Sequence, residues 1–340
     1  MKLKREEFLG ILKAVRPGLA KKEIIDRSTN FIFSGKSVLT YNDLICISHP
    51  LKTDFHCAVP AADFYKIVSG MEGDEIDLSC KEGKILLNGK KSRSGHASVS
   101  ELGGLEDLIK ALRLESSGRK WVSLPDDFIE GLKLCMFSVS QDATQIALSC
   151  VSVNNSTIVS SDNNRISYYE MKKGLKAEFL IRGSSVVELV NFPVVEFCLS
   201  DAWIYFRTKE NVIFASRRNE GEFPDVSSFL ELKGQKITFP KELRGLVQDV
   251  TVMAPGEFEI DKKISLRVEK GRIICRGEKE QGWMEKDLDF EGYTGKGVEF
   301  QVNPIFFEQV LGKSTSVVLG DGRALFTSGK FRHLMCLPVE

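Results

Sequence analysis

The sequence has no run of about 18 apolar residues that could cross a membrane as a helix. Its N-terminus, MKLKREEFLGIL, has Glu6 and Glu7 where a signal peptide needs an apolar core, so we expect a cytoplasmic protein without membrane contact. Only ten of 340 residues are proline and 42% are apolar, which predicts a globular chain with few disordered tracts. The 47 basic and 47 acidic residues cancel, which excludes a surface that is basic throughout but permits one basic face.

No Cys-x-x-Cys pair occurs among the eight cysteines, and their apolar surroundings favour small buried side chains over disulfides or zinc ligands. The four histidines, His49, His56, His96 and His333, are isolated, so we expect no metal site. Phosphate-binding loops, dinucleotide-binding glycine motifs and nucleophile motifs are also missing. The sequence therefore predicts neither a cofactor nor an enzyme. A hydrolase with an unrecognised carboxylate site stays an alternative, and Asp162 is the residue that would test it.

Two short segments each recur three times, about 120 residues apart. The first segment reads EEFLGILK from Glu6, DDFIEGLK from Asp126 and KELRGLVQ from Lys241. The second reads VPAADFYKIV from Val59, IRGSSVVELV from Ile181 and VNPIFFEQVL from Val302. Apolar residues at helical spacing and a start signal in each copy predict short amphipathic helices.

Alternating apolar and polar residues around Gly or Asp turns follow the second segment, as in EIDLSCKEGKILLNG, and predict antiparallel strand pairs. The chain thus reads as an α+β protein of three similar domains, each with two helices and antiparallel sheets. We place the domains at residues 1–115, 116–232 and 233–340.

Basic residues accompany the first helix of each domain. They are Lys13, Arg16, Lys21 and Lys22 in domain one, Lys133 in domain two, and Lys241 and Arg244 in domain three. If the three helices face one surface, that surface is positive and can contact a phosphate backbone without reading bases. Lysines on a solvated helix face are the plain alternative.

Several motifs occur in order along the whole chain. They are LTYNDLICI from Leu39, VSSDNNRISYYEM from Val159, GEFPDVSSFL from Gly221, FEGYTGKGVEFQVN from Phe290 and the terminal LMCLPVE. Together they resemble the bacterial DNA polymerase III beta subunit, the DNA sliding clamp, in which a T-D-G-H-R-L turn and a G-x-F-P-D-Y loop stand at the second and third of these places.

The resemblance implies a head-to-tail homodimeric ring whose helices surround double-stranded DNA without sequence specificity. Such a ring is a processivity factor that needs a clamp loader and tethers the replicative polymerase and other proteins carrying short peptide motifs. Lys22 falls where the family has a DNA-contacting loop, and Arg182 begins an inner helix. An interaction protein of the same fold that sequesters host replication partners stays an alternative.

The family's partner-peptide pocket implies a set of site residues in this chain. They are Leu148, Ser161, Asn163, Asn164, Arg165, Ile166, Pro224, Ser228, Phe229, Met335, Leu337, Pro338 and Val339. Asn163 and Asn164 replace the family's Gly-His, while Ser228 and Glu340 stand where the family has basic residues. These departures imply a retuned pocket and suggest a phage- or plasmid-encoded member of the family.

The family's subunit contact maps onto Val252 and Met253 in domain three, and onto Leu102 or Leu105 in domain one. Apolar residues of this kind also serve as ordinary core residues, which is the alternative to a subunit contact.

Overall fold

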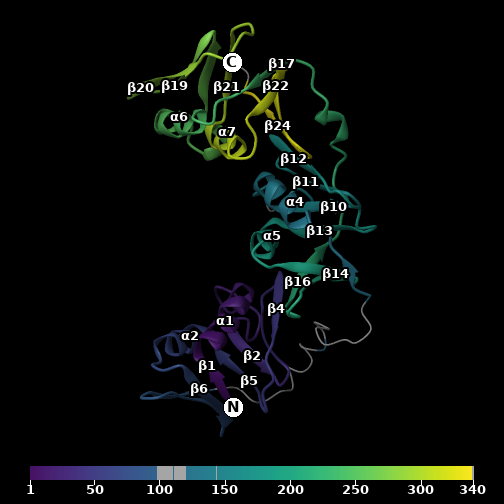
Figure 1. The fold of residues 1–340 in the computed structure, drawn as a ribbon, viewed down its shortest axis with the longest axis vertical. Helices are drawn as coiled ribbons and strands as arrows, with labels where there is room; N and C mark the ends of the chain where they lie inside the picture. Colours follow the sequence, from purple (N-terminus) through teal and green to yellow (C-terminus); the bar gives the residue numbers. More distant parts are fainter. Residues whose placement is uncertain (98–109, 111–119, 143, 339–340) are drawn as a thin grey trace. The chain divides into compact units, whose positions relative to one another are not determined.

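The structure, a computed structural model, describes residues 1–97, 110, 120–142 and 144–338. Its contacts divide the chain into two units. Unit 1 comprises Met1–Asp126 and Ser184–Asn219, and unit 2 comprises Asp127–Gly183 and Glu220–Glu340. Each unit combines helices with antiparallel sheets (Figure 1).

Unit 1 contains a large sheet with the strand order β9-β14-β15-β16-β4-β3-β2-β5. These strands are β9 (Val122–Ser123), β14 (Val194–Leu199), β15 (Trp203–Thr208), β16 (Ile213–Asn219), β4 (Ile45–Pro50), β3 (Ser37–Tyr41), β2 (Asn30–Ser34) and β5 (His56–Pro60). A second sheet has the order β1-β6-β7-β8, formed by β1 (Lys2–Lys4), β6 (Glu75–Lys81), β7 (Lys84–Asn88) and β8 (Arg93–Ala97).

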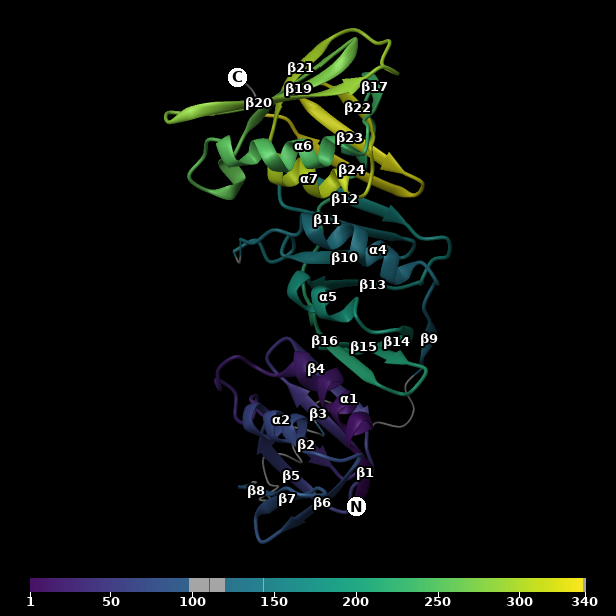
Figure 2. The same cartoon turned by 60° about the vertical axis from the view of Figure 1, so that its left-hand side comes forward.

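Helices α1 (Arg5–Val15) and α2 (Ala61–Gly70) lie side by side against these sheets (Figure 2). Phe64 of α2 forms the centre of their core, because its ring meets those of Phe8, Phe31 and Phe33 edge-on with centroids 6.2 Å apart in each pair. Edge-to-face packing of this kind adds stability beyond the burial of the rings. The buried face of α1 thus follows from the apolar spacing of its sequence.

Unit 2 also contains a large sheet, with the strand order β17-β22-β23-β24-β12-β11-β10-β13. Its strands are β17 (Gln235–Thr238), β22 (Ser316–Gly320), β23 (Arg323–Ser328), β24 (Phe331–Cys336), β12 (Arg165–Glu170), β11 (Thr157–Ser161), β10 (Cys150–Asn154) and β13 (Glu178–Arg182). The smaller sheet runs β20-β19-β18-β21, formed by β20 (Gly282–Phe290), β19 (Gly271–Lys279), β18 (Ile264–Glu269) and β21 (Val298–Val302).

The helices of unit 2 are α4 (Phe128–Cys135), α6 (Leu243–Val250) and α7 (Pro304–Leu311), while α5 (Gly183–Leu189) begins at its boundary. Asn303 starts α7, since its side chain accepts hydrogen bonds from the backbone of Ile305 at 3.0 Å and Phe306 at 3.1 Å. Helix α6 packs against α7, β19 and β20. Short 3-10 turns complete the fold at η1 (Arg16–Gly18), η2 (Met136–Ser138), η3 (Ser227–Leu230), η4 (Thr251–Met253) and η5 (Glu259–Asp261).

Among the described residues, the helices α1, α2, α4, α5, α6 and α7 each overlap a copy of one of the two repeated segments, so the predicted α+β class with antiparallel strand pairs is confirmed. Six cysteines are buried, whereas Cys80 is half-buried and Cys336 is exposed. In the part of the chain that the structure describes, no helix is both long and apolar enough to span a membrane. Helix α4 begins two residues later than the segment predicts, at Phe128. The carboxylate of Asp127 instead accepts hydrogen bonds from the Tyr169 hydroxyl at 3.3 Å and the Lys172 backbone at 2.9 Å.

Candidate functional site

The turn between β11 and β12 is built by its own side chains. Asp162 accepts hydrogen bonds through Oδ1 from the backbone N–H groups of Asn164, at 3.1 Å, and Arg165, at 3.0 Å. Asn163 lies in the left-handed region with φ 71°, a conformation that asparagine tolerates better than most residues. The Asn-Asn pair is therefore compatible with a tight turn that needs no glycine.

Arg165 lies beneath this turn rather than on the surface. Its guanidinium donates through Nε to Asp162 Oδ2 at 2.7 Å, and the two side chains are only 7% and 13% exposed. It lies 3.8 Å from the ring centroid of Phe306 and 5.5 Å from that of Phe137, and it also donates to Gln309. Burial lowers the pKa of Arg165, and the charge of Asp162 opposes that shift. Arg165 thus joins the turn to α7 within unit 2.

The C-terminal strand β24 ends beside the same turn, to which it is hydrogen-bonded. The Cys336 backbone N–H donates to the Asn164 carbonyl at 2.8 Å, and Leu337 donates to the Gly322 carbonyl at 2.8 Å. Met335, opposite Arg165 in the β12–β24 pair, is fully buried in the core around α6 and α7, and Leu337 packs against that core. Met335 and Leu337 thus lie beneath the surface next to the turn, and Pro338 beside them is half-buried.

The opposite face of β12 and β24 is covered by a loop of residues 220–231, which we call the acidic loop. Its buried residues Val226 and Leu230 form one apolar cluster with Ile166 and Leu334. Phe229 points away from this cluster enough to be 47% exposed. Pro224 and Ser228 are exposed on the same loop. The loop therefore holds its outer side chains in place by burying its inner ones.

A second loop, described at residues 140–142 and 144–149, adjoins the turn, and we call it the 140–149 loop. Gln145 Oε1 accepts a hydrogen bond from the Asn163 side-chain amide at 2.8 Å. The Ser140 backbone N–H donates to the Leu148 carbonyl at 2.9 Å, which closes the loop. Ile146 at its tip is 54% exposed.

Unit 2 thus holds the residues predicted for the peptide pocket, as far as the structure describes them, on connected elements: the turn with Ser161, the 140–149 loop, the acidic loop and the C-terminal strand. Val339 lies outside the described residues. The sequence alone did not single out Gln145, Ile146, Phe306 or Gln309. Ile146 had a usable signal, because it is an apolar residue next to the polar run QDATQ, whereas Phe306 reads as an ordinary core residue of an apolar helix.

The predicted DNA-facing residues fall in both units. In unit 1, Lys13, Lys21 and Lys22 are exposed, and Arg16 stacks over the Tyr65 ring at 4.5 Å. In unit 2, Lys133 and Lys241 are exposed, as is Arg244, which donates to Glu308 Oε1 at 2.6 Å. Arg182 is half-buried and donates to Ser149 Oγ at 2.9 Å. The lysines therefore offer charge to solvent, whereas the arginines also make contacts inside the protein.

Of the predicted subunit-contact residues, Leu102 and Leu105 lie outside the described residues. Val252 is 69% exposed on η4, and Met253 beside it is half-buried. A side chain at Gly277 of β19 would meet the backbone of Val250 and Met253 at 2.9 and 3.0 Å, so η4 lies tightly against the sheet. Val252 is thus an apolar side chain displayed on a rigid support.

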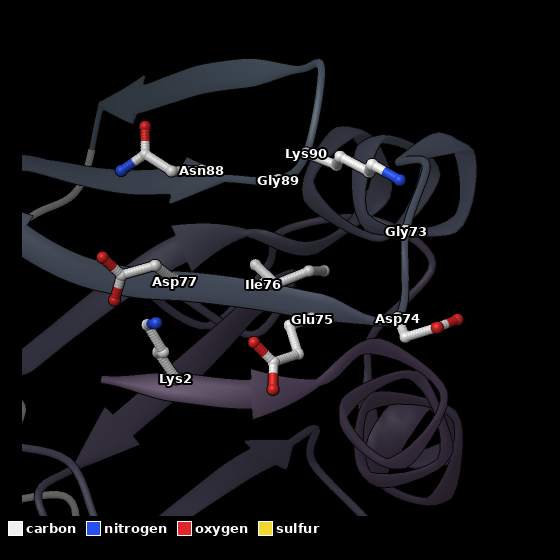
Figure 3. A pocket seen from close by; sticks show the side chains of 9 residues that line it. All are labelled: Lys2, Gly73, Asp74, Glu75, Ile76, Asp77, Asn88, Gly89 and Lys90. Carbon is white, nitrogen blue, oxygen red and sulfur yellow. The ribbon is translucent and has the colours of Figure 1, made fainter.

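A hollow of about 350 Å³ lies beside β1 and β6 in unit 1 (Figure 3). Its lining includes Lys2, Asp74, Glu75, Asp77 and Lys90. The labelled side chains point in different directions, and Asp77 accepts from the N-terminal amine of Met1 at 3.1 Å. Among the described residues, no group of three or more His, Cys, Asp or Glu is placed to hold a metal ion. The hollow has no convergent set of ligands, so we assign it no function.

No protein-family model matches the sequence, and a comparison with curated proteins finds no match. Solved structures do match. The DNA polymerase III beta chain of Streptococcus pneumoniae superposes with a TM-score of 0.85 at 17% identity, covering 100% of this chain and 99% of that chain. The sliding clamp (DNA polymerase III subunit beta) of Pseudomonas aeruginosa gives 0.84 at 17% identity, with coverage of 100% and 99%. The DNA polymerase sliding clamp of Bacillus subtilis gives 0.80 at 14% identity, with coverage of 100% and 98%. This chain has the sliding-clamp fold.

Proposed function

We propose that the protein is a DNA polymerase processivity factor, a sliding clamp that encircles double-stranded DNA in the cytoplasm and does no chemistry itself. The observation that carries the proposal is the likeness to sliding clamps over the full length of both chains. A fold alone does not define a function. Three surface features therefore also support the proposal: strand edges that are unpaired among the described residues, exposed lysines and the connected loops of unit 2.

The ring requires a second copy of the chain. Strands β8 and β20 each pair on one side only among the described residues, and β20 is nine residues long. Long exposed edges invite pairing with another chain, and soluble proteins usually cover or shorten them. Exposed Val252 lies on η4 beside β19 and β20. A homodimer that joins domain three of one copy to domain one of the next would cover both the edge and the apolar side chain.

DNA contact in this proposal comes from exposed basic residues such as Lys13, Lys21, Lys22, Lys133 and Lys241. Lysine neutralises backbone phosphates without reading base sequence, which suits a ring that must move along the duplex. The chain's zero net charge means that any attraction is local and falls with added salt.

The partner site in this proposal is the surface formed by the turn, the 140–149 loop, the acidic loop and the C-terminal strand of unit 2. Exposed Phe229 and Ile146 offer apolar contacts, and Asn163 and Asn164 offer polar ones. Short peptide segments of the replicative polymerase, the clamp loader and other DNA-handling proteins would bind there, because a few apolar anchors give moderate affinity and rapid exchange.

The first test is the solution mass by light scattering at micromolar concentration. We expect twice the chain mass of 38.1 kDa for the native chain. Val252→Asp should yield monomers, because it places a charge in the proposed contact. Glu257→Lys, an exposed change on the same segment, is the matched control and should leave the dimer intact. A monomeric native chain at every concentration would contradict the ring.

Encirclement itself has a topological test. Dimers are dissociated by dilution and reconcentrated with circular or linear DNA, and retention is measured in high salt. We expect retention on circles that is lost after linearisation, because an enclosed ring can leave only over an end. Equal retention on both forms would indicate ordinary binding and would contradict the clamp proposal.

A further inference from the structure

The acidic loop has one sign of charge throughout. Its sequence, EGEFPDVSSFLE, carries Glu220, Glu222, Asp225 and Glu231 and no basic residue, and all four carboxylates are exposed. The same twelve residues hold exposed Phe229 and Pro224. Apolar contacts and negative charge are therefore presented together on one short segment.

The loop is fixed in place, so this combination is a stable feature of the surface. Val226 and Leu230 are buried in the cluster on β12 and β24. Asp225 Oδ1 accepts from the Ser227 backbone at 2.9 Å, and the Phe229 N–H donates to the Val226 carbonyl at 3.1 Å. Hydrogen bonds from the backbone and side chain of Ser227 lower the pKa of Asp225.

Basic residues on the neighbouring elements do not fully offset the negative charge of the acidic loop. Asp162 and Arg165 neutralise each other in the turn. Asp142 on the 140–149 loop adds a further exposed carboxylate. On the adjoining strands, Arg332 lies over the Tyr168 ring at 4.6 Å, and Arg323 lies 3.8 Å from Asp321. Three exposed basic residues, Arg217, Arg218 and Lys233, flank the loop along the chain, and Arg217 lies over the Trp203 ring at 4.8 Å. The four carboxylates of the loop and that of Asp142 outnumber them.

We infer that this surface selects partner peptides whose apolar anchor is flanked by lysine or arginine and disfavours peptides with acidic flanks. The inference rests on the proposed function, because it names the partner class of the same site. Phe229, Pro224 and Ile146 take the apolar anchor, and the four carboxylates of the loop take the basic flank. Charge complementarity across such a rim acts mainly on specificity and on the association rate.

The test uses three synthetic fluorescein-labelled peptides with the same Leu and Phe anchors and two Lys, two Ser or two Glu as flanks. Binding to the full chain is followed by fluorescence anisotropy at low and high salt. We expect the Lys-flanked peptide to bind tightest and the Glu-flanked one weakest, with about a tenfold span at low salt. The span should shrink at high salt, because exposed charges are screened.

A charge-reversed variant sharpens the test. Glu222→Lys with Glu231→Lys should reverse the order of the Lys- and Glu-flanked peptides. Glu257→Lys with Glu280→Lys makes the same change in net charge at exposed positions outside the loop and should leave the order unchanged.

The outcomes separate the inference from the proposed function. Binding of all three peptides with equal affinity, or tightest binding of the Glu-flanked one, overturns the inference and leaves the peptide site standing. If both double variants change the order of peptide affinities equally, the inference is also overturned, because the preference would then depend on the net charge of the protein and not on the loop. Failure of all three peptides to bind overturns the inference and the proposed peptide site together.

Discussion

The two faces of strand β12 differ in the side chains that they contact: one face makes polar contacts and the other apolar ones. On one face, Arg165 and Ser167 are buried among polar partners: Arg165 contacts Asp162 and Gln309, and Ser167 contacts His333. On the other face, Ile166 belongs to an apolar cluster, and part of that cluster comes from the acidic loop. Successive residues of one strand thus face buried polar contacts on one side and a loop-covered apolar cluster on the other.

The two faces of β12 therefore differ in role: one holds the structure in place, and the other anchors a loop with exposed side chains. A buried charge network holds its members in one arrangement, because every broken contact leaves a desolvated polar group. In a loop that is held by a few buried apolar residues, the exposed residues can be substituted without disturbing the strands beneath. The polar face therefore positions the turn with Asn163 and Asn164, and the apolar face carries the loop whose exposed side chains we propose as the partner-selecting ones.

The largest effect is expected from breaking the polar face with Arg165→Ala. The change leaves the Asp162 carboxylate, which is only 13% exposed, without its cation and uncovers Gln309. Losing one partner of a buried pair typically costs about 3 to 5 kcal/mol, and we expect about 3 kcal/mol here, because Asp162 keeps two backbone donors. Urea unfolding followed by circular dichroism measures the loss.

The matched control for that variant is Arg332→Ala on the neighbouring strand. Arg332 is half-buried and stacks on Tyr168, so its removal should cost under about 1 kcal/mol. Equal losses from the two variants would refute the view that Arg165 is a structural support.

A smaller effect is expected from loosening the apolar face with Leu230→Ala. Truncating this buried side chain should cost about 2 kcal/mol, because a cavity opens between the acidic loop and β24. The loop should also become a better substrate for a protease that cleaves after glutamate, since Glu222 and Glu231 flank the change. Ser228→Ala, an exposed substitution, should leave the cleavage rate at the native value. An unchanged rate in Leu230→Ala would mean that Leu230 does not hold the loop.

Helical spacing, the start of α7 at Asn303 and the Asn-Asn turn were readable from the sequence, because each depends on residues a few positions apart. The role of Arg165 was not, since an arginine in the run SSDNNR reads as an exposed turn residue. Its partner Gln309 lies 144 residues further along the chain, and no local pattern predicts a contact at that separation. Met335 shows a related limit. The apolar run LMCL predicts a buried strand, but not that Met335 faces the helices while Leu334 faces the acidic loop.

At neutral pH the smallest effect is expected at His333, which belongs to the polar face and is fully buried between the rings of Phe137 and Phe331. Its Nδ1 lies 2.9 Å from Ser167 Oγ. Burial, aided by the charge of Arg165, lowers the pKa of His333 to about 3. The unfolded chain therefore takes up a proton below about pH 6.5 that the folded protein refuses, so the free energy of unfolding falls as the pH drops from about 6.5 towards 3.

The contribution of His333 to that fall is at most about 1.4 kcal/mol per pH unit, and it is complete near pH 3. Carboxylates titrate in the same range, so the quantity to measure is the difference between the native chain and His333→Phe in urea unfolding at successive pH values. We expect the difference to shift steadily in favour of His333→Phe as the pH falls. His56→Gln, at an exposed site, should track the native chain. Parallel curves for the native chain and His333→Phe would mean that His333 accepts a proton in the folded protein. The polar face would then tolerate a second cation beside Arg165, and its rigidity would need another source.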